Sequence, residues 1–358
     1  MAYQFEGETT MHMSDALLSP AVGATFWAGT IGTIAYCSKK IKENSDEKMI
    51  PLMGVTGAFI FAAQMINFSI PGTGSSGHLG GGMILSILLG PYAAFIVMAS
   101  VLTIQALFFA DGGLLALGCN IWNLGIYPCF IAYPFIYKPI VQKEMTPKRI
   151  MVASMVSVIF ALQLGAFSVV LETLLSGRSE LPFTTFILLV QPIHLAIGIV
   201  EGFVTAGVIN YVRTARPELL ESVVESRRLS PGIKVKKIVL TLLIISAIVG
   251  GIVSWFASSY PDGLEWSIEK VYGKRELPEQ ETGIAALLKA IQEKTAFLPD
   301  YTFKEKKAPK EQESPGGEVS AWPNVETGTS VSGILGSMMV FGLIFLIGFG
   351  IKAIRKKG

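Results

Sequence analysis

The sequence predicts an all-α integral membrane protein. Hydrophobic residues make up 51% of its 358 residues and charged residues only 16%, whereas about 25% of a soluble domain is charged. The apolar residues gather in eight long runs. Each run could cross a hydrocarbon core of about 30 Å as a helix that rises about 1.5 Å per residue. The runs cover 17–37, 50–68, 83–109, 114–137, 150–175, 184–212, 238–257 and 334–351.

The loops between these runs differ in positive charge. Nineteen of the 29 Lys and Arg residues lie in segments 38–49, 138–149, 213–237 and 352–358. Short basic loops stay in the cytoplasm. If the third run, 83–109, crossed the membrane only once, the basic segments 38–49 and 138–149 would lie on opposite sides of the membrane. If Gly90-Pro91 instead breaks this run into a hairpin of two short segments, all four basic segments are cytoplasmic. We therefore predict nine segments in the cell membrane, with the N-terminus outside and the C-terminus inside.

The chain is expected to divide at the basic segment 213–237, a cytoplasmic linker. Before it, residues 11–212 form a seven-segment core that includes the broken hairpin, and residues 1–10 precede this core as an extension. After it, residues 238–358 form a two-helix C-terminal part. Its polar loop, 258–333, is long enough to be exported largely regardless of its nine basic residues.

Two of the three histidines adjoin apolar runs at the predicted outer face. His78 lies in a loop, 70–82, whose many glycines let backbone approach closely. His12 precedes the first run. If the mature chain began at Met11, its terminal amine, the His12 amide nitrogen and the His12 ring could chelate one ion in a plane, and His78 would complete the square. Four nitrogens in a square suit Ni(II) or Cu(II), whereas Zn(II) favours a tetrahedron.

The alternative is that both histidines are interfacial residues held by hydrogen bonds. Around them we expect Asn67, Ser76 and Asp15 to support the ligands, Asn67 because it leads into the loop. Asp15 and Asp111 could attract cations or cap helix ends.

Other polar residues lie inside the apolar runs. His194 is an intramembrane ionisable residue, a kind that often marks a functional site, but it could equally tie helices together by hydrogen bonds. We interpret Gln64, Gln105 and Glu201 in the same structural way. His194→Ala is therefore expected mainly to lower stability.

No catalytic motif competes with a metal-binding role. The sequence lacks a Gly-x4-Gly-Lys-Ser/Thr phosphate loop and a His-Glu-x-x-His motif, so neither ATP hydrolysis nor zinc proteolysis is expected of this chain. No basic cluster is interleaved with aromatic residues, so nucleic acid is not an expected partner. The rival functions are an intramembrane metalloenzyme, which would need an activated water near a general base, and a metal-gated channel or sensor.

Three motifs resemble one family of transporters. Met11-His-Met-Ser-Asp-Ala-Leu-Leu-Ser-Pro20 resembles the amino-terminal signature of the CbiM/NikM substrate-binding components of cobalt and nickel energy-coupling-factor (ECF) transporters. Ser75-Ser-Gly-His-Leu-Gly-Gly-Gly82 resembles their metal-binding loop, and Pro192-Ile-His-Leu-Ala-Ile-Gly-Ile-Val-Glu-Gly202 their sixth-run signature. Tyr260-Pro-Asp-Gly-Leu-Glu-Trp266 is similar to the accessory component NikN or CbiN, here fused to the same chain.

The resemblance implies a metal held by Met11, His12 and His78. It also implies partners, namely a transmembrane coupling (T) protein and two cytoplasmic ATPases that drive import. Fusion of the M- and N-type parts favours nickel(II) as the transported ion, with cobalt(II) as the alternative. Residues 1–10 depart from the family pattern, because with them present the Met11 nitrogen is an amide and not a free amine, which weakens the chelate. We expect translation to start at Met11; the alternatives are that the extension is removed or that the site differs.

A second feature bears on the coupling partner. The first run carries small residues at helical spacing, among them Gly23, Ala24, Ala28 and Gly32. These residues could dock against a helix of the coupling protein, or they could pack the core of this chain.

Overall fold

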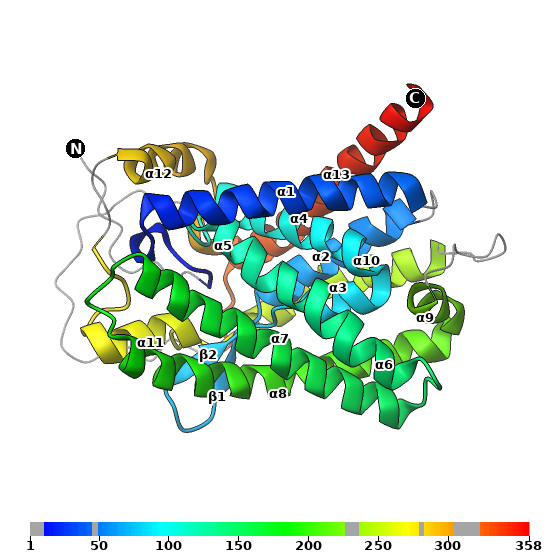
Figure 1. Ribbon diagram of the computed structural model, residues 1–358, viewed down its shortest axis with the longest axis horizontal. Coiled ribbons are helices and arrows are strands. Elements are labelled where there is room, and N and C mark those ends of the chain that lie inside the picture. The colour runs from blue at the N-terminus through cyan, green and yellow to red at the C-terminus, as the bar shows by residue number, and fades with distance from the viewer. Residues whose placement is uncertain (1–10, 45–48, 226–235, 279–282, 304–322, 358) are drawn as a thin grey trace.

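The computed structural model describes residues 11–44, 49–225, 236–278, 283–303 and 323–357 (Figure 1). The predicted extension 1–10 lies outside the described residues, as do parts of the basic linker and of the 258–333 loop. The described chain is almost entirely helical. Five of its helices are long and apolar enough to cross a membrane, which confirms the predicted class.

Helices follow one another along the described residues of the chain. In order they are η1 (Asp15–Leu17), α1 (Pro20–Asn44), α2 (Met49–Gln64), α3 (Gly82–Leu89), α4 (Pro91–Phe109), α5 (Leu117–Ile121), η2 (Trp122–Tyr137), α6 (Lys138–Val141), α7 (Pro147–Leu175), α8 (Phe183–Ala215), α9 (Pro217–Val224), α10 (Lys236–Gly251), η3 (Val253–Phe256), α11 (Gly263–Tyr272), α12 (Gly283–Thr295), η4 (Pro299–Tyr301) and α13 (Thr327–Lys357).

The third apolar run is broken where the sequence predicted. α3 ends at Leu89 and α4 begins at Pro91, while Gly90 between them has a φ of 78°. Proline cannot donate the backbone hydrogen bond that would continue α3, and glycine takes up the left-handed turn without strain. The eight residues of α3 span only about 12 Å. They therefore cover less than half of a bilayer, and the loop before α3 must cover the rest.

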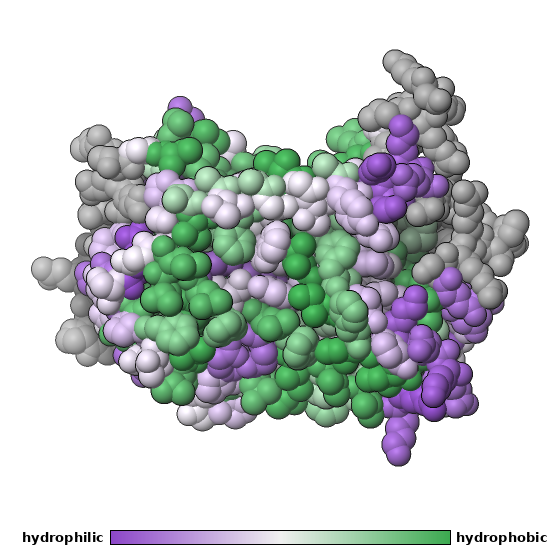
Figure 2. Space-filling model, in the orientation of Figure 1, coloured by the Kyte–Doolittle hydropathy of each residue, from purple (hydrophilic) through white to green (hydrophobic). Residues whose placement is uncertain are grey.

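The helix α4 forms the centre of the bundle. Its apolar span is 78% buried, against 28% for α8, because α4 is apolar on every side and packs on α1, α2, α3 and η2. By contrast, α7 and α8 pack on each other and expose large apolar side chains, among them Phe160 and Phe203. Figure 2 shows the resulting apolar surface across the middle of the molecule. Such a surface is expected to face lipid.

The helix after α5 is wound more widely than an α-helix. η2 is a π-helical stretch of 16 residues and contains Pro128 and Pro134. Each proline removes a backbone donor, and a π-helical stretch, which is rare and usually a single turn, often lies at a functional site. The Cβ of an alanine at Gly82 would lie 2.5 Å from the Pro128 ring, so the start of α3 packs directly against η2.

The segment after α2 was predicted as part of a membrane run, but α2 ends at Gln64. The chain then forms a two-stranded antiparallel sheet, β1 (Phe68–Ile70) and β2 (Ser75–Gly77), in which Ser69 pairs with Ser76. The sequence did not predict these strands. Each strand has only three residues, too few for the alternating pattern that predicts a strand.

The two ends of the bundle differ in character. α11 and α12 lie at one end, and α6, α9 and the end of α13 lie at the other (Figure 1). The first end also holds the turn after α4, since Gln292 of α12 donates a hydrogen bond to the Gly112 carbonyl at 2.7 Å. The most hydrophilic surface in view gathers at the second end (Figure 2). The described parts of the basic segments that the sequence assigned to the cytoplasm therefore share this second end.

We expect Gly90→Ala to destabilise the fold. A Cβ at a φ of 78° costs about 1–2 kcal/mol, and Gly90 lies against Val223 of α9, whose Cγ1 would be 3.7 Å from that Cβ. Thermal unfolding in detergent measures the change. Gly32→Ala is the matched control, because its Cβ meets nothing within 4 Å. Equal melting temperatures for the two variants would contradict the role assigned to Gly90.

Candidate metal centre

The structure brings together the two histidines that the sequence singled out. The imidazole rings of His12 and His78 lie edge to face, with centroids 5.3 Å apart, although 65 residues separate them in the chain. His12 precedes η1 and is 5% exposed. His78 directly follows β2. Two imidazole rings at this separation could approach one ion.

His78 lies against the backbone of Met11. Its Nε2 atom is 3.0 Å from the Met11 carbonyl oxygen, and its Nδ1 atom is 3.2 Å from the Leu79 carbonyl oxygen. Burial, and then the neighbouring His12, lower the pKa of His78 to about 4. The ring is therefore neutral near pH 7. Both neighbours are carbonyl oxygens, which only accept, so a neutral ring donates to one of them. When Nδ1–H donates to Leu79, Nε2 keeps the lone pair that a metal ligand needs, and an ion bound there would replace the contact of Nε2 with the Met11 carbonyl.

The ring of His12 is held by α4. Its Nε2 atom lies 3.1 Å from Oε1 of Gln105 and 3.8 Å from Oδ2 of Asp111. With Nε2–H donating to Gln105, the Nδ1 atom of His12 keeps its lone pair. This nitrogen can reach the same ion as the backbone nitrogen of His12, because the two atoms close a six-membered chelate ring.

Asp111 connects the segment of His12 to the rest of the site. Its Oδ1 atom accepts a hydrogen bond from the Met11 N–H at 2.9 Å, and its Oδ2 atom accepts one from the Tyr301 hydroxyl at 2.6 Å. The carboxylate is 2% exposed. From the sequence alone, Asp111 could either attract cations or cap the end of a helix. One sequence signal near Asp111 is the Gly-Gly pair that follows it. Glycine is needed at position 112, because a Cβ there would lie 2.9 Å from Cβ of His12.

Asn120 fixes the next residue of the same segment. Its side chain accepts from the Met13 N–H at 3.2 Å and donates to the Met13 carbonyl at 3.1 Å. The Gly113 N–H also donates to that carbonyl, at 3.1 Å. The backbone from Met11 to Met13 is therefore held by polar groups of the chain between α4 and α5, and its nitrogens have defined positions.

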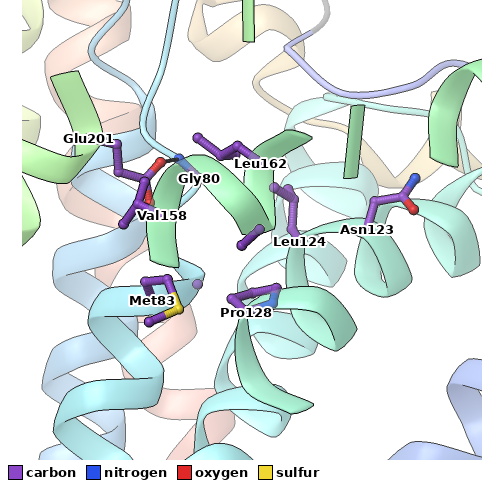
Figure 3. A pocket seen from close by; sticks show the side chains of 10 residues that line it. Gly80, Met83, Asn123, Leu124, Pro128, Val158, Leu162 and Glu201 are labelled. Carbon is purple, nitrogen blue, oxygen red and sulfur yellow. Dashed lines mark hydrogen bonds between the residues drawn. The ribbon is translucent and has the colours of Figure 1, made fainter. Parts of the chain in front are cut away.

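A buried carboxylate holds the loop that carries His78. Glu201 of α8 is 2% exposed and accepts hydrogen bonds from the N–H groups of Gly80, at 2.7 Å, and Gly81, at 2.9 Å. Figure 3 shows the Glu201 carboxylate directed at Gly80. Gln64 of α2 donates to the Gly80 carbonyl at 2.9 Å. Gly81 has a φ of 77°, and a Cβ there would lie 2.8 Å from Ile60, so this close approach needs glycine.

The residues expected to support the ligands make their hydrogen bonds elsewhere. The Ser76 hydroxyl donates to the Tyr260 carbonyl at 2.8 Å, and the Asp15 carboxylate accepts from the Ala116 N–H at 2.9 Å. The backbone carbonyl of Asn67 accepts a hydrogen bond from the Ser258 N–H at 2.7 Å. Ser76 and Asn67 thus attach the loop to the C-terminal part. Gln105 contacts the His12 ring, and Asp111 holds the Met11 nitrogen and lies close to that ring.

A cavity of about 90 Å³ adjoins both imidazoles and lies between the core and the C-terminal part. His194 lines it from α8, and its Nδ1–H donates to the Val190 carbonyl at 2.8 Å. Asp262 lines it from the start of α11, where it accepts a hydrogen bond from the Glu265 N–H at 2.7 Å. Burial raises the pKa of Asp262 to about 7.

Side chains alone do not complete a ligand set in this region. Within the described part of the chain, no three His, Cys, Asp or Glu side chains lie close enough to hold a metal ion. His12 and His78 supply two nitrogens. The backbone of Met11 lies beside the His78 ring, and the Met11 and His12 nitrogens are the further ligands that the sequence predicts.

The fold and the paired imidazoles define a multi-pass membrane protein with a candidate transition-metal centre. Residues 12–219 match the family described as CbiM, the cobalt uptake substrate-specific transmembrane region. The chain belongs to this family. Residues 236–353 match the PDGLE domain, whose motif here is Pro261-Asp-Gly-Leu-Glu265. The predicted fusion of an M-type to an N-type component is thus confirmed.

Known relatives extend over most of the chain. It is 31% identical, over 339 residues, to a putative fused nickel transport protein NikMN of Archaeoglobus fulgidus, with 94% of this chain and 98% of the relative covered. It is 26% identical to a cobalt transport protein CbiM of Geobacter sulfurreducens, with 73% and 77% covered. A solved structure of a truncated transition metal transporter is 31% identical, with a TM-score of 0.50, and covers 57% of this chain and 99% of its own length.

We expect Glu201→Gln to loosen the His78 loop. The amide keeps one acceptor oxygen but sets an NH₂ group against a backbone N–H of Gly80 or Gly81. Leaving a buried donor unpaired costs about 1–3 kcal/mol, so deuterium uptake by peptides covering 79–84 should accelerate. Glu172→Gln is the matched control, since that buried carboxylate binds Asn123 and Ser168 instead. Unchanged exchange in Glu201→Gln would show that the carboxylate does not hold the loop.

Proposed function

We propose that this chain is the metal-binding membrane component of an ATP-driven ECF importer and that its transported ion is nickel(II). The observation that carries the proposal is the contact of His12 and His78 with each other and with the Met11 backbone. Membership of a metal-uptake family agrees with it. The chain binds the ion and is not itself an enzyme.

In the proposed site four nitrogens surround the ion. They are the Met11 nitrogen, as an amine when the chain begins there, the amide and ring nitrogens of His12, and Nε2 of His78. The amide loses its proton on binding, so the ion and this ligand together carry one positive charge. The buried Asp111 carboxylate, which accepts from the Met11 nitrogen, balances that charge. A metal-bound amine keeps its N–H bonds, so this hydrogen bond survives binding.

The ligand set favours nickel over zinc. Four nitrogens in one plane match Ni(II), whereas Zn(II) prefers a tetrahedron. The relative that matches nearly the full length of the chain is named as a fused nickel transport protein. Another relative is named for cobalt, and cobalt(II) is the alternative substrate of the same site.

Import by this chain requires partners that hydrolyse ATP, because its sequence contains no phosphate loop. We propose a transmembrane coupling protein and two cytoplasmic ATPases, with α1 as a docking surface. Ala24, Ala28 and Gly32 of α1 are exposed, whereas Gly23 is buried against Leu115. The exposed small residues would let a partner helix approach closely.

The metal centre is proposed to face the outside of the cell. The basic segments gather at the opposite end of the bundle, which the positive-inside rule assigns to the cytoplasm. The domain boundaries predicted from the sequence follow the same division, with a core up to residue 212, a basic cytoplasmic linker and an external loop in the C-terminal part.

His78→Ala and His12→Ala are each expected to abolish stoichiometric nickel binding, since each removes a ring ligand. Metal content of the purified full chain, with intact mass to identify the first residue, measures this, and competition with cobalt(II) ranks the two ions. In His194→Ala we expect bound nickel to persist while the melting temperature falls. Full nickel content in His78→Ala would place the metal elsewhere.

Cysteine labelling in intact cells tests the orientation. In a background with the native cysteines replaced, Pro71→Cys, at the exposed turn between β1 and β2, should react with a membrane-impermeant maleimide. Glu221→Cys, exposed on α9, should react only after the cells are opened. The reverse pattern would invert the proposed topology.

A further inference from the structure

We propose that the C-terminal part completes the metal centre through Tyr301, whose hydroxyl fixes the Asp111 carboxylate and thereby positions the Met11 and His12 ligands. The inference rests on the proposed function. Tyr301 does not touch the ion in this arrangement. It is a positioning residue that acts through Asp111.

The contacts around Asp111 form a continuous path. The Tyr301 hydroxyl donates to Oδ2 of Asp111 at 2.6 Å, and Oδ1 of the same carboxylate accepts from the Met11 nitrogen at 2.9 Å. Oδ2 also lies 3.8 Å from Nε2 of His12. Tyr301 is 8% exposed and Asp111 2%, so water does not readily replace either bond. One hydroxyl thus connects the C-terminal part to two proposed ligands.

Tyr301 is anchored to both parts of the chain. Its ring stacks on Phe109 of α4 with centroids 5.1 Å apart and planes 18° apart. Its carbonyl accepts from the Ser332 hydroxyl of α13 at 2.8 Å. Just before η4, the Leu298 N–H donates to the Phe108 carbonyl at 3.3 Å. These contacts determine where the hydroxyl lies, so its position depends on docking of the C-terminal part.

The backbone at this position is strained. Asp300 and Tyr301 have φ values of 50° and 60°, in the left-handed region that residues with a Cβ rarely occupy. Such conformations persist when surrounding contacts determine them, and they are concentrated at functional sites. The left-handed turn at Asp300 and Tyr301 directs the Tyr301 side chain at Asp111. A right-handed helical turn at the same position would direct this side chain elsewhere.

Without this hydroxyl, Oδ2 of Asp111 would lose its donor. One other donor within reach is Nε2–H of His12, which lies 3.8 Å from Oδ2 and 3.1 Å from Oε1 of Gln105. Rotation of the carboxylate toward His12 would weaken its bond to the Met11 nitrogen and turn the imidazole away from its own amide. Both changes disturb the planar chelate. Removal of the Tyr301 hydroxyl, which is not a ligand, should therefore change both the affinity for the metal and its coordination geometry.

The test is nickel(II) titration of the Tyr301→Phe protein in detergent, with parent and variant both beginning at Met11, as intact mass verifies. Phenylalanine keeps the stack on Phe109 and removes only the hydroxyl. Partners of ligating groups are typically worth about 10- to 100-fold in metal affinity, so we expect a loss of that size together with a shift of the visible absorption of bound nickel. Tyr272→Phe, on α11 of the same part, is the control and should bind as the parent does.

A double-mutant cycle with Asp111→Asn distinguishes positioning from general damage. If Tyr301 acts through Asp111, adding Tyr301→Phe to Asp111→Asn should cost little further affinity. Parental affinity and absorption in Tyr301→Phe, or fully additive losses in the double variant, would overturn the inference. Absence of nickel binding by the parent protein would instead overturn the proposed function, so the two failures are distinguishable.

Discussion

Two buried carboxylates hold the backbone segments around which this protein is arranged. Glu201 accepts two N–H groups of the loop that carries His78, and Asp111 accepts the N–H of Met11. A carboxylate inside an apolar bundle needs strong donors, and backbone N–H groups supply them here. Glu201 belongs to α8 and Asp111 to the turn after α4, so each fixes a non-helical segment to the helical bundle. The two histidines meet as a consequence.

The sequence predicted the fold and the paired histidines but not the contacts that hold them. Apolar length and charge asymmetry located the membrane runs and the break at Gly90, because these features are local or nearly so. The motifs around His12 and His78 carried a family resemblance, and the family match confirms it. Glu201, Gln105 and Tyr301 could not be assigned roles, since each acts on a residue far away in the chain and only packing brings them together.

The residues expected to support the ligands show the same limit. Asn67 leads into the loop and Ser76 lies two residues before His78, yet the Asn67 backbone carbonyl and the Ser76 hydroxyl bond to Ser258 and Tyr260 of the C-terminal part. Residues two apart in an extended segment share a side, so the pattern alone would place Ser76 beside the imidazole. Whether a polar group of this loop contacts the core or the C-terminal part depends on packing, which proximity along the chain does not reveal.

The proposed ligands and their partners come from segments that are far apart in the sequence. Residues 11–13, the loop after β2, the end of α4 and the turn at Tyr301 each contribute a group. A ligand that binds only the assembled state stabilises that state by mass action, so a bound ion would favour docking of the C-terminal part onto the core. By reciprocity, any movement that separates these segments must weaken metal binding. Release of the ion from the proposed site therefore requires displacement of one segment relative to the others and the return of a proton to the His12 amide.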